Sequence, residues 1–473
     1  MPVYFWLYAV CFLLLAALYY LLPHRYRWPL LLAAGYGLYA LGDILWLLPL
    51  LFVTLAAYAA GLLLEKTAAG AKQKALLAAA ALCLLLPFAL LNYILPLFAG
   101  KSHALLLPLG IGFYTLRALG YVIDVYRGDA KAERHLGIFA LFISFFPALP
   151  LGPVERAADL LPQLRQPHRF SLSACSDGLR LILWGLVKKA VIAAYLAPYV
   201  DRVFGNVQAF GGLTLIGSAV LLCLCLYCDF SGWIDIAAGC AALLGFRLAE
   251  NFRSPFYSSS LLDFWQRWHI TLTAWFRDYV YVPLRSLRAG RAWGAFSLFA
   301  ACLLYALWHG ASPTILLWGA GQGTLLLLEQ LCAPVTEKHL AAGPRWRRIL
   351  LAVGRRALVL SAVAAGFVAL RAESLADLLY IAGNFLRGIN PLRFFEYMQS
   401  IDLSPQSLLS IACAAAAVLL WDGAGRKNGD SLAHFKALPT PVRWALYYAA
   451  GFLLLLFFFT RLGHTAPFFR FPF

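Results

Sequence analysis

Long apolar segments recur along almost the entire chain, and this pattern is the strongest constraint on the fold. In the first quarter the connections between them contain only a few residues, and the apolar segments cover Val3–Leu22, Trp28–Leu41, Ile44–Leu64, Ala75–Phe98 and Leu105–Tyr126. A segment of about 20 apolar residues is long enough to cross a bilayer as a helix. The mean hydropathy of +0.74 over 473 residues therefore excludes a water-soluble protein and leaves no room for a large soluble catalytic domain.

The same pattern continues to the end of the chain. Further apolar segments cover Leu179–Val200, Leu213–Tyr227, Ile234–Leu248, Trp293–Leu307, Thr314–Leu331, Ile349–Leu370, Leu408–Trp421 and Val442–Thr460. Phe139–Leu151 is too short to cross and contains two prolines, so a re-entrant or interfacial segment is expected there. The fold class predicted is all-α, a polytopic protein of roughly 11–13 transmembrane or re-entrant helices, in one membrane domain over residues 1–473.

Basic residues cluster in every second connection of the first quarter. With 39 Lys and Arg against 22 Asp and Glu the chain carries a net charge of +17, but these clusters do not follow one polar face. The positive-inside rule places them in the cytoplasm and the N-terminus outside. We therefore expect the lipid bilayer and no nucleic acid as partner. The segment Met1–Leu22 has no basic leader region or cleavage site and is predicted to be a retained first helix.

The ten cysteines lie mostly in or beside apolar segments and are predicted to be small core residues. Cys223, Cys225 and Cys228 have no ligand other than Asp229 at zinc-site spacing, so no metal is expected. Motifs of serine hydrolases, phosphate-binding loops and zinc proteases are missing. Gly319, Gly321 and Gly323 are attributed to close helix packing.

His309 is the only His, Asp, Glu, Lys or Arg between Arg291 and Glu329, and Gly310, Ser312 and Pro313 break the apolar run beside it. We expect it at a helix end, because buried ionisable groups in membrane segments are costly and often functional. A neutral imidazole can accept a proton from an alcohol as a general base. The alternative is a structural histidine bonded to a nearby carbonyl.

A second histidine lies in an aromatic stretch. If Leu261–Leu284 is helical, one face carries Trp265, Trp268, His269, Leu272 and Phe276. The alternative is an interfacial amphipathic helix with an aromatic belt and basic side chains that extend to the interface.

Trp308-His309-Gly310-Ala311, about forty residues after the run from Arg267 to Tyr279, resembles the membrane-bound O-acyltransferase family, in its bacterial polysaccharide and peptidoglycan O-acetyltransferase branch. Further similarities lie at Gly120–Gly128, Ser144–Pro147, Leu160–Leu164, Tyr227–Gly232, Leu244–Arg247, Glu250–Phe252 and Ala466–Phe469. The motifs around Ile123–Gly128 and Leu161–Leu164 are closer to acetylating members than to D-alanylating ones, so acetyl is the acyl group expected.

The resemblance implies helices around a buried tunnel, with His309 and His269 as catalytic residues. Supporting or tunnel-lining residues are Trp265, Trp268, Trp308, Gly310, Arg277 and Asp278. It implies transfer of an acyl group from a cytoplasmic thioester donor, acetyl-CoA or an acyl carrier protein, to a polysaccharide hydroxyl outside the bacterial cytoplasmic (inner) membrane. An extracytoplasmic acyltransferase or another polysaccharide-modifying partner is expected, since this chain has no such domain. The competing hypotheses are a multi-pass transporter with a buried histidine relay and a structural scaffold in which His309 is dispensable.

Overall fold

The computed structural model describes residues 2–96, 108–341, 344–390, 394–425 and 431–460. Every regular element in these ranges is a helix, apart from an isolated antiparallel bridge between Phe252 and Trp268. The C-terminal motif Ala466–Phe469 and the first residues of the predicted segment Leu105–Tyr126 lie outside the described residues.

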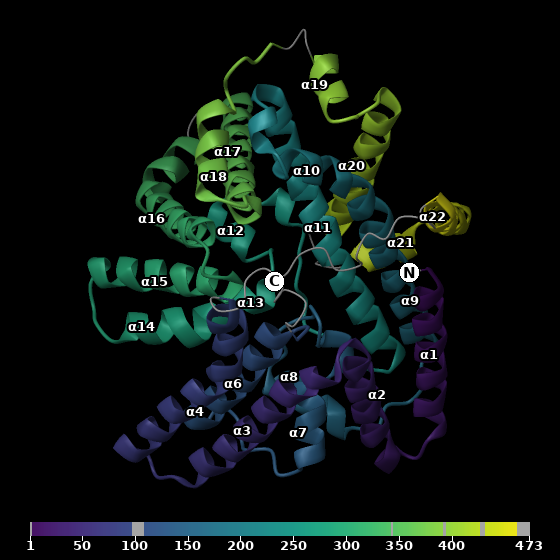
Figure 1. The fold of residues 1–473 in the computed structure, drawn as a ribbon, viewed down its shortest axis with the longest axis vertical. Helices are drawn as coiled ribbons and strands as arrows, with labels where there is room; N and C mark the ends of the chain where they lie inside the picture. The colour runs from purple at the N-terminus through teal and green to yellow at the C-terminus, as the bar shows by residue number, and fades with distance from the viewer. Residues whose placement is uncertain (1, 97–107, 342–343, 391–393, 426–430, 461–473) are drawn as a thin grey trace. The chain divides into compact units, whose positions relative to one another are not determined.

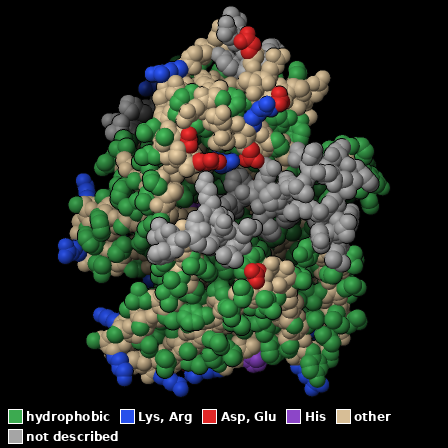
Figure 2. All heavy atoms as spheres, viewed as in Figure 1, with side chains coloured by type: hydrophobic (Ala, Val, Ile, Leu, Met, Phe, Trp, Pro, Cys, Tyr) green, Lys and Arg blue, Asp and Glu red, His purple; other side chains and the backbone are tan. Residues whose placement is uncertain are grey.

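Nine helical segments within the described ranges are long and apolar enough to cross a membrane, and two shorter apolar helices accompany them at Tyr8–Leu21 and Leu136–Ala148. This confirms the predicted all-helical, polytopic membrane protein. Large apolar side chains also lie on the surface, where Leu82, Leu358 and Leu420 are each more than 70% exposed. Hydrophobic side chains dominate the face drawn in Figure 2, as expected of a surface that contacts lipid.

The chain divides into two compact units, and the first comprises residues 1–183, 233–250 and 458–473. Its helices include α1 (Pro2–Leu21), α2 (Arg27–Gly42), α3 (Leu47–Lys66), α4 (Ala71–Ala89), α6 (Ile111–Arg127), α7 (Leu136–Ile143) and α8 (Ala157–Arg165). α3 packs against α4 and α6, while α7 packs against α2 and α8 (Figure 1).

The short apolar segment Phe139–Leu151 is a broken helix, in which α7 ends at Ile143 and a 3-10 turn follows at Phe146–Ala148. Arg117, 1% exposed, donates hydrogen bonds to four carbonyl groups along and just beyond this break, those of Phe142, Ile143, Ala148 and Pro153. Buried carbonyls that the broken helix leaves unsatisfied need such donors.

The second unit comprises residues 184–232 and 251–457. Its helices include α10 (Ala194–Phe204), α12 (Leu261–Trp265), α13 (Ile270–Phe276), α14 (Val282–Ser286), α15 (Arg291–His309), α16 (Pro313–Ala341), α17 (Arg345–Arg371), α18 (Leu375–Asn384), α19 (Phe394–Ser400), α20 (Pro405–Gly425), α21 (Ser431–Ala437) and α22 (Thr440–Thr460). α16 packs against both α15 and α17 (Figure 1). Helices α9 (Leu172–Leu186) and α11 (Gly212–Leu243) contribute residues to both units, as does α22 at its C-terminal end.

The prediction of two separate segments at Leu213–Tyr227 and Ile234–Leu248 is wrong, because α11 runs unbroken from the first into the second and ends at Leu243. The polar residues Asp229 and Ser231 between them have hydrogen-bond partners within the protein. Asp229 Oδ1 pairs with Lys189 Nζ at 2.6 Å, and the Ser231 hydroxyl accepts from Lys188 Nζ at 2.9 Å while donating to the Tyr227 carbonyl. Lys188 and Lys189 are thus buried inside the protein, on the π-helical turn η6 (Val187–Ala193).

The glycines of α16 differ in their role. A Cβ at Gly319 would lie 2.4 Å from the Cβ of Ala306, and one at Gly323 would lie 3.0 Å from the ring of Phe299. Close packing on α15 is therefore confirmed at both positions. The same explanation is wrong for Gly321, where a Cβ would meet nothing within 4 Å.

Candidate active site

The predicted continuous helix through Trp265, Trp268, His269, Leu272 and Phe276 is wrong. α12 ends at Trp265, α13 begins at Ile270, and His269 between them adopts left-handed backbone angles (φ 47°, ψ 52°). The preceding segment pairs with this stretch: the N–H of Arg253 donates to the carbonyl of Arg267 at 2.9 Å, and that of Ile270 donates to Asn251 at 3.0 Å. This pairing holds a conformation that is uncommon for a non-glycine residue and that often marks functional sites.

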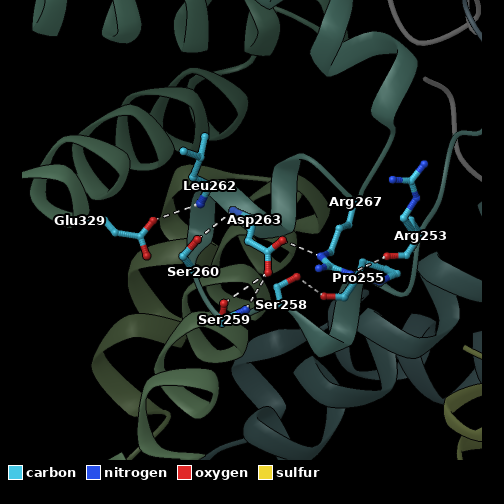
Figure 3. Close-up of polar contacts among 9 residues, drawn as sticks. All are labelled: Arg253, Pro255, Ser258, Ser259, Ser260, Leu262, Asp263, Arg267 and Glu329. Carbon is cyan, nitrogen blue, oxygen red and sulfur yellow. Dashed lines mark hydrogen bonds and ion pairs between the residues drawn. The ribbon is translucent and has the colours of Figure 1, made fainter. Parts of the chain in front are cut away.

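A network of polar contacts holds the segment that precedes His269 in the sequence (Figure 3). The carboxylate of Asp263 accepts from Arg267 Nε at 2.6 Å and from the backbone N–H of Ser259 at 3.0 Å. Glu329 on α16 accepts from the backbone N–H groups of Leu261 and Leu262 at 2.9 and 3.1 Å. Glu329 therefore ties the start of α12 to α16, since these N–H groups at a helix start have no partner within the helix.

His269 is 2% exposed and lies among aromatic rings. Its ring centroid is 4.7 Å from that of Phe230 and 6.4 Å from that of Trp308, both in edge-on arrangements. Its Nδ1 lies 3.2 Å from Oδ1 of Asn251. Burial, with a smaller contribution from the charge of His309, lowers the pKa of His269 well below its ordinary value. Burial therefore favours the neutral imidazole.

His309 is the last residue of α15, as predicted, and Gly310 ends the helix with φ 150°. Three aromatic rings surround it: Trp308 at 4.8 Å between ring centroids, and Tyr305 and Trp318 at 5.4 Å each. Trp308 thus lies beside both histidine rings, so the structure brings together the two histidine motifs that the sequence separates by about forty residues.

The other two predicted tryptophans lie in neighbouring positions. Trp265 contacts the rings of Tyr305 and Trp318, and its indole N–H donates to Gln322 Oε1 at 3.2 Å. Trp268 belongs to an adjoining cluster, in which it stacks on Phe264 and contacts the rings of Phe252, Phe367 and Tyr227. Arg277 and Asp278 form an ion pair at 2.6 Å with both side chains partly exposed.

Sequence reasoning missed four residues of this site: Tyr305, Trp318, Gln322 and Asn251. Tyr305 lies one helical turn before His309, and that spacing could have indicated the contact. Asn251 lies in the segment Glu250–Phe252, which belongs to the resemblance, but its contact with His269 depends on the tertiary fold, so its role was not predicted. Among the described residues no group of three or more His, Cys, Asp or Glu side chains could hold a metal ion.

A site of two imidazoles in an aromatic cluster can move a proton between a hydroxyl and a leaving group. Comparison with known proteins agrees with such chemistry. Residues 31–364 match the membrane-bound O-acyltransferase family (MBOAT).

Two of the relatives are acetylating proteins. A probable alginate O-acetylase, AlgI, of Pseudomonas syringae pv. tomato is 35% identical over 417 residues, which cover 85% of this chain and 76% of the relative. A peptidoglycan O-acetyltransferase of Helicobacter pylori is 30% identical over 61% of this chain and 63% of its own length.

A teichoic acid D-alanyltransferase of Bacillus subtilis is more distant, at 26% identity over 56% of this chain and 73% of its own length. The similarity is thus greater to the acetylating relatives, as the motifs around Ile123–Gly128 and Leu161–Leu164 predict. The family match extends over well over half of the chain and includes both histidine motifs. The chain therefore belongs to the membrane-bound O-acyltransferase family, in its bacterial polysaccharide and peptidoglycan O-acetyltransferase branch, and is a multi-pass membrane enzyme that transfers acyl groups to oxygen.

Proposed function

We propose that this protein transfers an acetyl group from a cytoplasmic thioester, acetyl-CoA or an acetylated carrier protein, to a hydroxyl group of a cell-surface or secreted polysaccharide. The observation that carries the proposal is the position of Trp308, whose ring lies beside both His269 and His309 in one aromatic cluster. The names of the two acetylating relatives support acetyl and polysaccharide as the reactants.

In the proposed reaction His309 is the general base. It takes the proton of the acceptor hydroxyl as that oxygen attacks the thioester carbonyl, a C–O bond forms, the C–S bond breaks, and the proton passes to the departing thiolate. His269 orients or polarises a reactant. The rings of Trp265, Trp308 and Trp318 keep water out of the reaction space, which limits hydrolysis of the thioester.

Gly310 ends helix α15 directly after His309. Trp268 pairs with Phe252 in the β-bridge and so helps to hold the segment that contains His269. Arg277 and Asp278 form an ion pair directly after α13 and have a structural role there. We place the protein in the bacterial cytoplasmic membrane, with all of residues 1–473 working as one membrane domain around a tunnel between donor and acceptor. An extracytoplasmic acyltransferase partner completes delivery to the polymer.

The test is release of radiolabelled acetyl from acetyl-CoA by purified protein in lipid, for wild type, His309→Ala and His269→Ala at equal folded amounts. His434→Ala is the matched control, because this exposed histidine lies on α21. We expect His309→Ala to lose about 10²- to 10⁴-fold in rate and the control to retain full activity. If wild type is silent with acetyl-CoA, the assay is repeated with an acetylated carrier protein and candidate partners. Full activity of His309→Ala with any donor and partner that support wild-type activity would contradict the role of His309 as general base.

A further inference from the structure

The side chain of Asn251 is buried, 1% exposed, and its Oδ1 atom is the meeting point of three contacts. The backbone N–H of Thr271 donates to it at 3.1 Å, the Thr271 hydroxyl donates at 2.8 Å, and His269 Nδ1 lies 3.2 Å away. Asn251 also accepts the backbone N–H of Ile270 through its own carbonyl. One asparagine therefore holds the backbone on the far side of His269 and touches the imidazole ring.

The orientation of this amide follows from chemistry. A backbone N–H can only donate, so the atom of Asn251 that faces Thr271 must be the oxygen and not the NH₂ group. The same oxygen faces His269 Nδ1, and an amide oxygen can only accept. His269 Nδ1 must then carry the proton.

We propose that Asn251 is a positioning residue that fixes His269 as the Nδ1–H tautomer, leaving Nε2 with its lone pair as the working atom of the ring. A neutral imidazole carries one proton, so a proton on Nδ1 makes Nε2 an acceptor. This inference rests on the proposed function and narrows the role of His269 within it. His269 cannot donate a hydrogen bond to the thioester carbonyl through Nε2. It can accept one, from a hydroxyl group of the polysaccharide acceptor.

The surroundings of the ring favour the neutral form that this role needs. Phe230 on α11 and Trp308 on α15 present uncharged faces, and His309 at the end of α15 is the titratable group whose charge opposes a second positive charge. Neutral imidazole in water prefers the Nε2–H tautomer. An Nδ1–H tautomer at His269 would therefore show that the contact with Asn251 determines where the proton is.

The first test reads the tautomer directly. Protein with ¹⁵N-labelled histidine rings is reconstituted in lipid and measured by solid-state NMR near pH 7, with the His269 signals assigned by comparison with His269→Gln. We expect a protonated Nδ1 and an unprotonated Nε2 in wild type, and a change to Nε2–H in Asn251→Leu. An Nε2–H ring in wild type, or an unchanged ring in Asn251→Leu, overturns the inference.

Two controls separate positioning from general loss of structure. Thr271→Val removes one donor to Oδ1 but leaves the His269 contact, so the tautomer stays Nδ1–H. Asn384→Leu removes a half-buried asparagine whose Nδ2 donates to the Tyr380 carbonyl, away from His269, and should change neither tautomer nor rate. If Asn251→Leu does not fold, the wild-type and Thr271→Val spectra still decide the tautomer.

The second test uses activity. Asn251→Leu should lower kcat by about 10- to 100-fold with little change in KM, as the loss of a partner that orients a histidine does at other sites. Asn251→Asp places a carboxylate beside Nδ1, which favours imidazolium and blocks the Nε2 lone pair. Its rate should therefore be low at neutral pH and recover as pH rises, with the acid limb of the pH profile shifted upward by a unit or more. A profile identical to wild type contradicts the inference. Failure of the proposed acetyl transfer itself shows as inactivity of wild type and leaves the NMR result unaffected.

Discussion

The ammonium group of Lys189 lies 2.6 Å from the carboxylate of Asp229, and the two side chains are 3% and 14% exposed within membrane-crossing segments. Breaking such a pair leaves one charge buried without its counter-charge, which costs about 3–5 kcal/mol. We expect Lys189→Met and Asp229→Leu each to lower the thermal unfolding temperature in detergent strongly, and the double variant to be less destabilised than either.

The comparison for this pair is Arg202 and Asp402, an ion pair on the surface of the same unit with 47% and 72% exposed side chains. Exposed pairs contribute about 0–1 kcal/mol, so Arg202→Gln should shift the unfolding temperature little. A double variant as unstable as the sum of its singles would show that Lys189 and Asp229 do not stabilise each other.

Gly310 is required by the backbone that ends α15. Its φ of 150° is a conformation that side chains rarely adopt, and a Cβ would lie 2.9 Å from Cδ1 of Ile315. Gly310→Ala should cost about 1–3 kcal/mol and displace His309, lowering acetyl transfer. Gly321→Ala on α16 is the matched control, because its Cβ meets nothing within 4 Å. Equal activity and unfolding temperature for both variants would contradict the role given to Gly310.

Gly366 on α17 makes room for the polar edge of the aromatic cluster. A Cβ there would lie 2.7 Å from Gln322 Nε2 and 3.1 Å from Trp318 Nε1. Since Gln322 also accepts the indole N–H of Trp265, Gly366→Ala should disturb that bond and cost about 1–3 kcal/mol. The unfolding temperature and the acetyl-transfer rate should both fall. Gly354→Ala, on the same helix with open space around it, should leave both unchanged.

Glu155 makes stability depend on pH. Burial raises the pKa of this carboxyl to about 7, against partial compensation by the N–H of Ala249 and by Arg117. Because the folded pKa lies above the unfolded one, the folded state binds the extra proton between the two values. Binding of this proton to Glu155 stabilises the folded protein by up to about 3 kcal/mol. The contribution is complete below pH about 4.5 and is lost as pH rises through about 7.

Unfolding temperatures measured from pH 4.5 to 8 in wild type and Glu155→Gln test this dependence. The glutamine keeps an oxygen for the Ala249 N–H but does not titrate, so the slope over this range should flatten in the variant. Asp43→Asn serves as a control in an exposed cap, where its side chain accepts from Leu45. A slope of the same size in Glu155→Gln would assign the pH dependence to other groups.

Hydropathy predicted the membrane class and most helices of this protein, because a span must be apolar over its whole length. α2, α3 and α17 begin and end within a few residues of the predicted segments. The same reasoning predicted a break between Tyr227 and Ile234 that does not exist. A polar residue normally interrupts a membrane-spanning segment, but Asp229 is compensated by an ion pair with Lys189. That information is tertiary.

The two histidines were identified from sequence for different reasons. His309 is the only His, Asp, Glu, Lys or Arg in a long apolar stretch, a local signal of its position at a helix end. His269 was placed correctly in an aromatic environment but on a helix face that does not exist, because the bridge between Phe252 and Trp268 overrides local periodicity. The contacts of Asn251 and Gln322 could not be predicted, since their partners His269 and Trp265 lie 18 and 57 positions away in the sequence.

Helix α11 has 32 residues and is therefore about 48 Å long, whereas the hydrocarbon layer of a bilayer measures about 30 Å. Such a helix either tilts or extends beyond the hydrocarbon, and both responses depend on the lipid around it. The acyl-chain length of the surrounding lipid is therefore expected to affect this enzyme, through hydrophobic mismatch with α11. Since Asp229 and Ser231 lie close to the middle of α11, their lysine partners lie far from both ends of this helix, and a change in its tilt moves the buried charges with it.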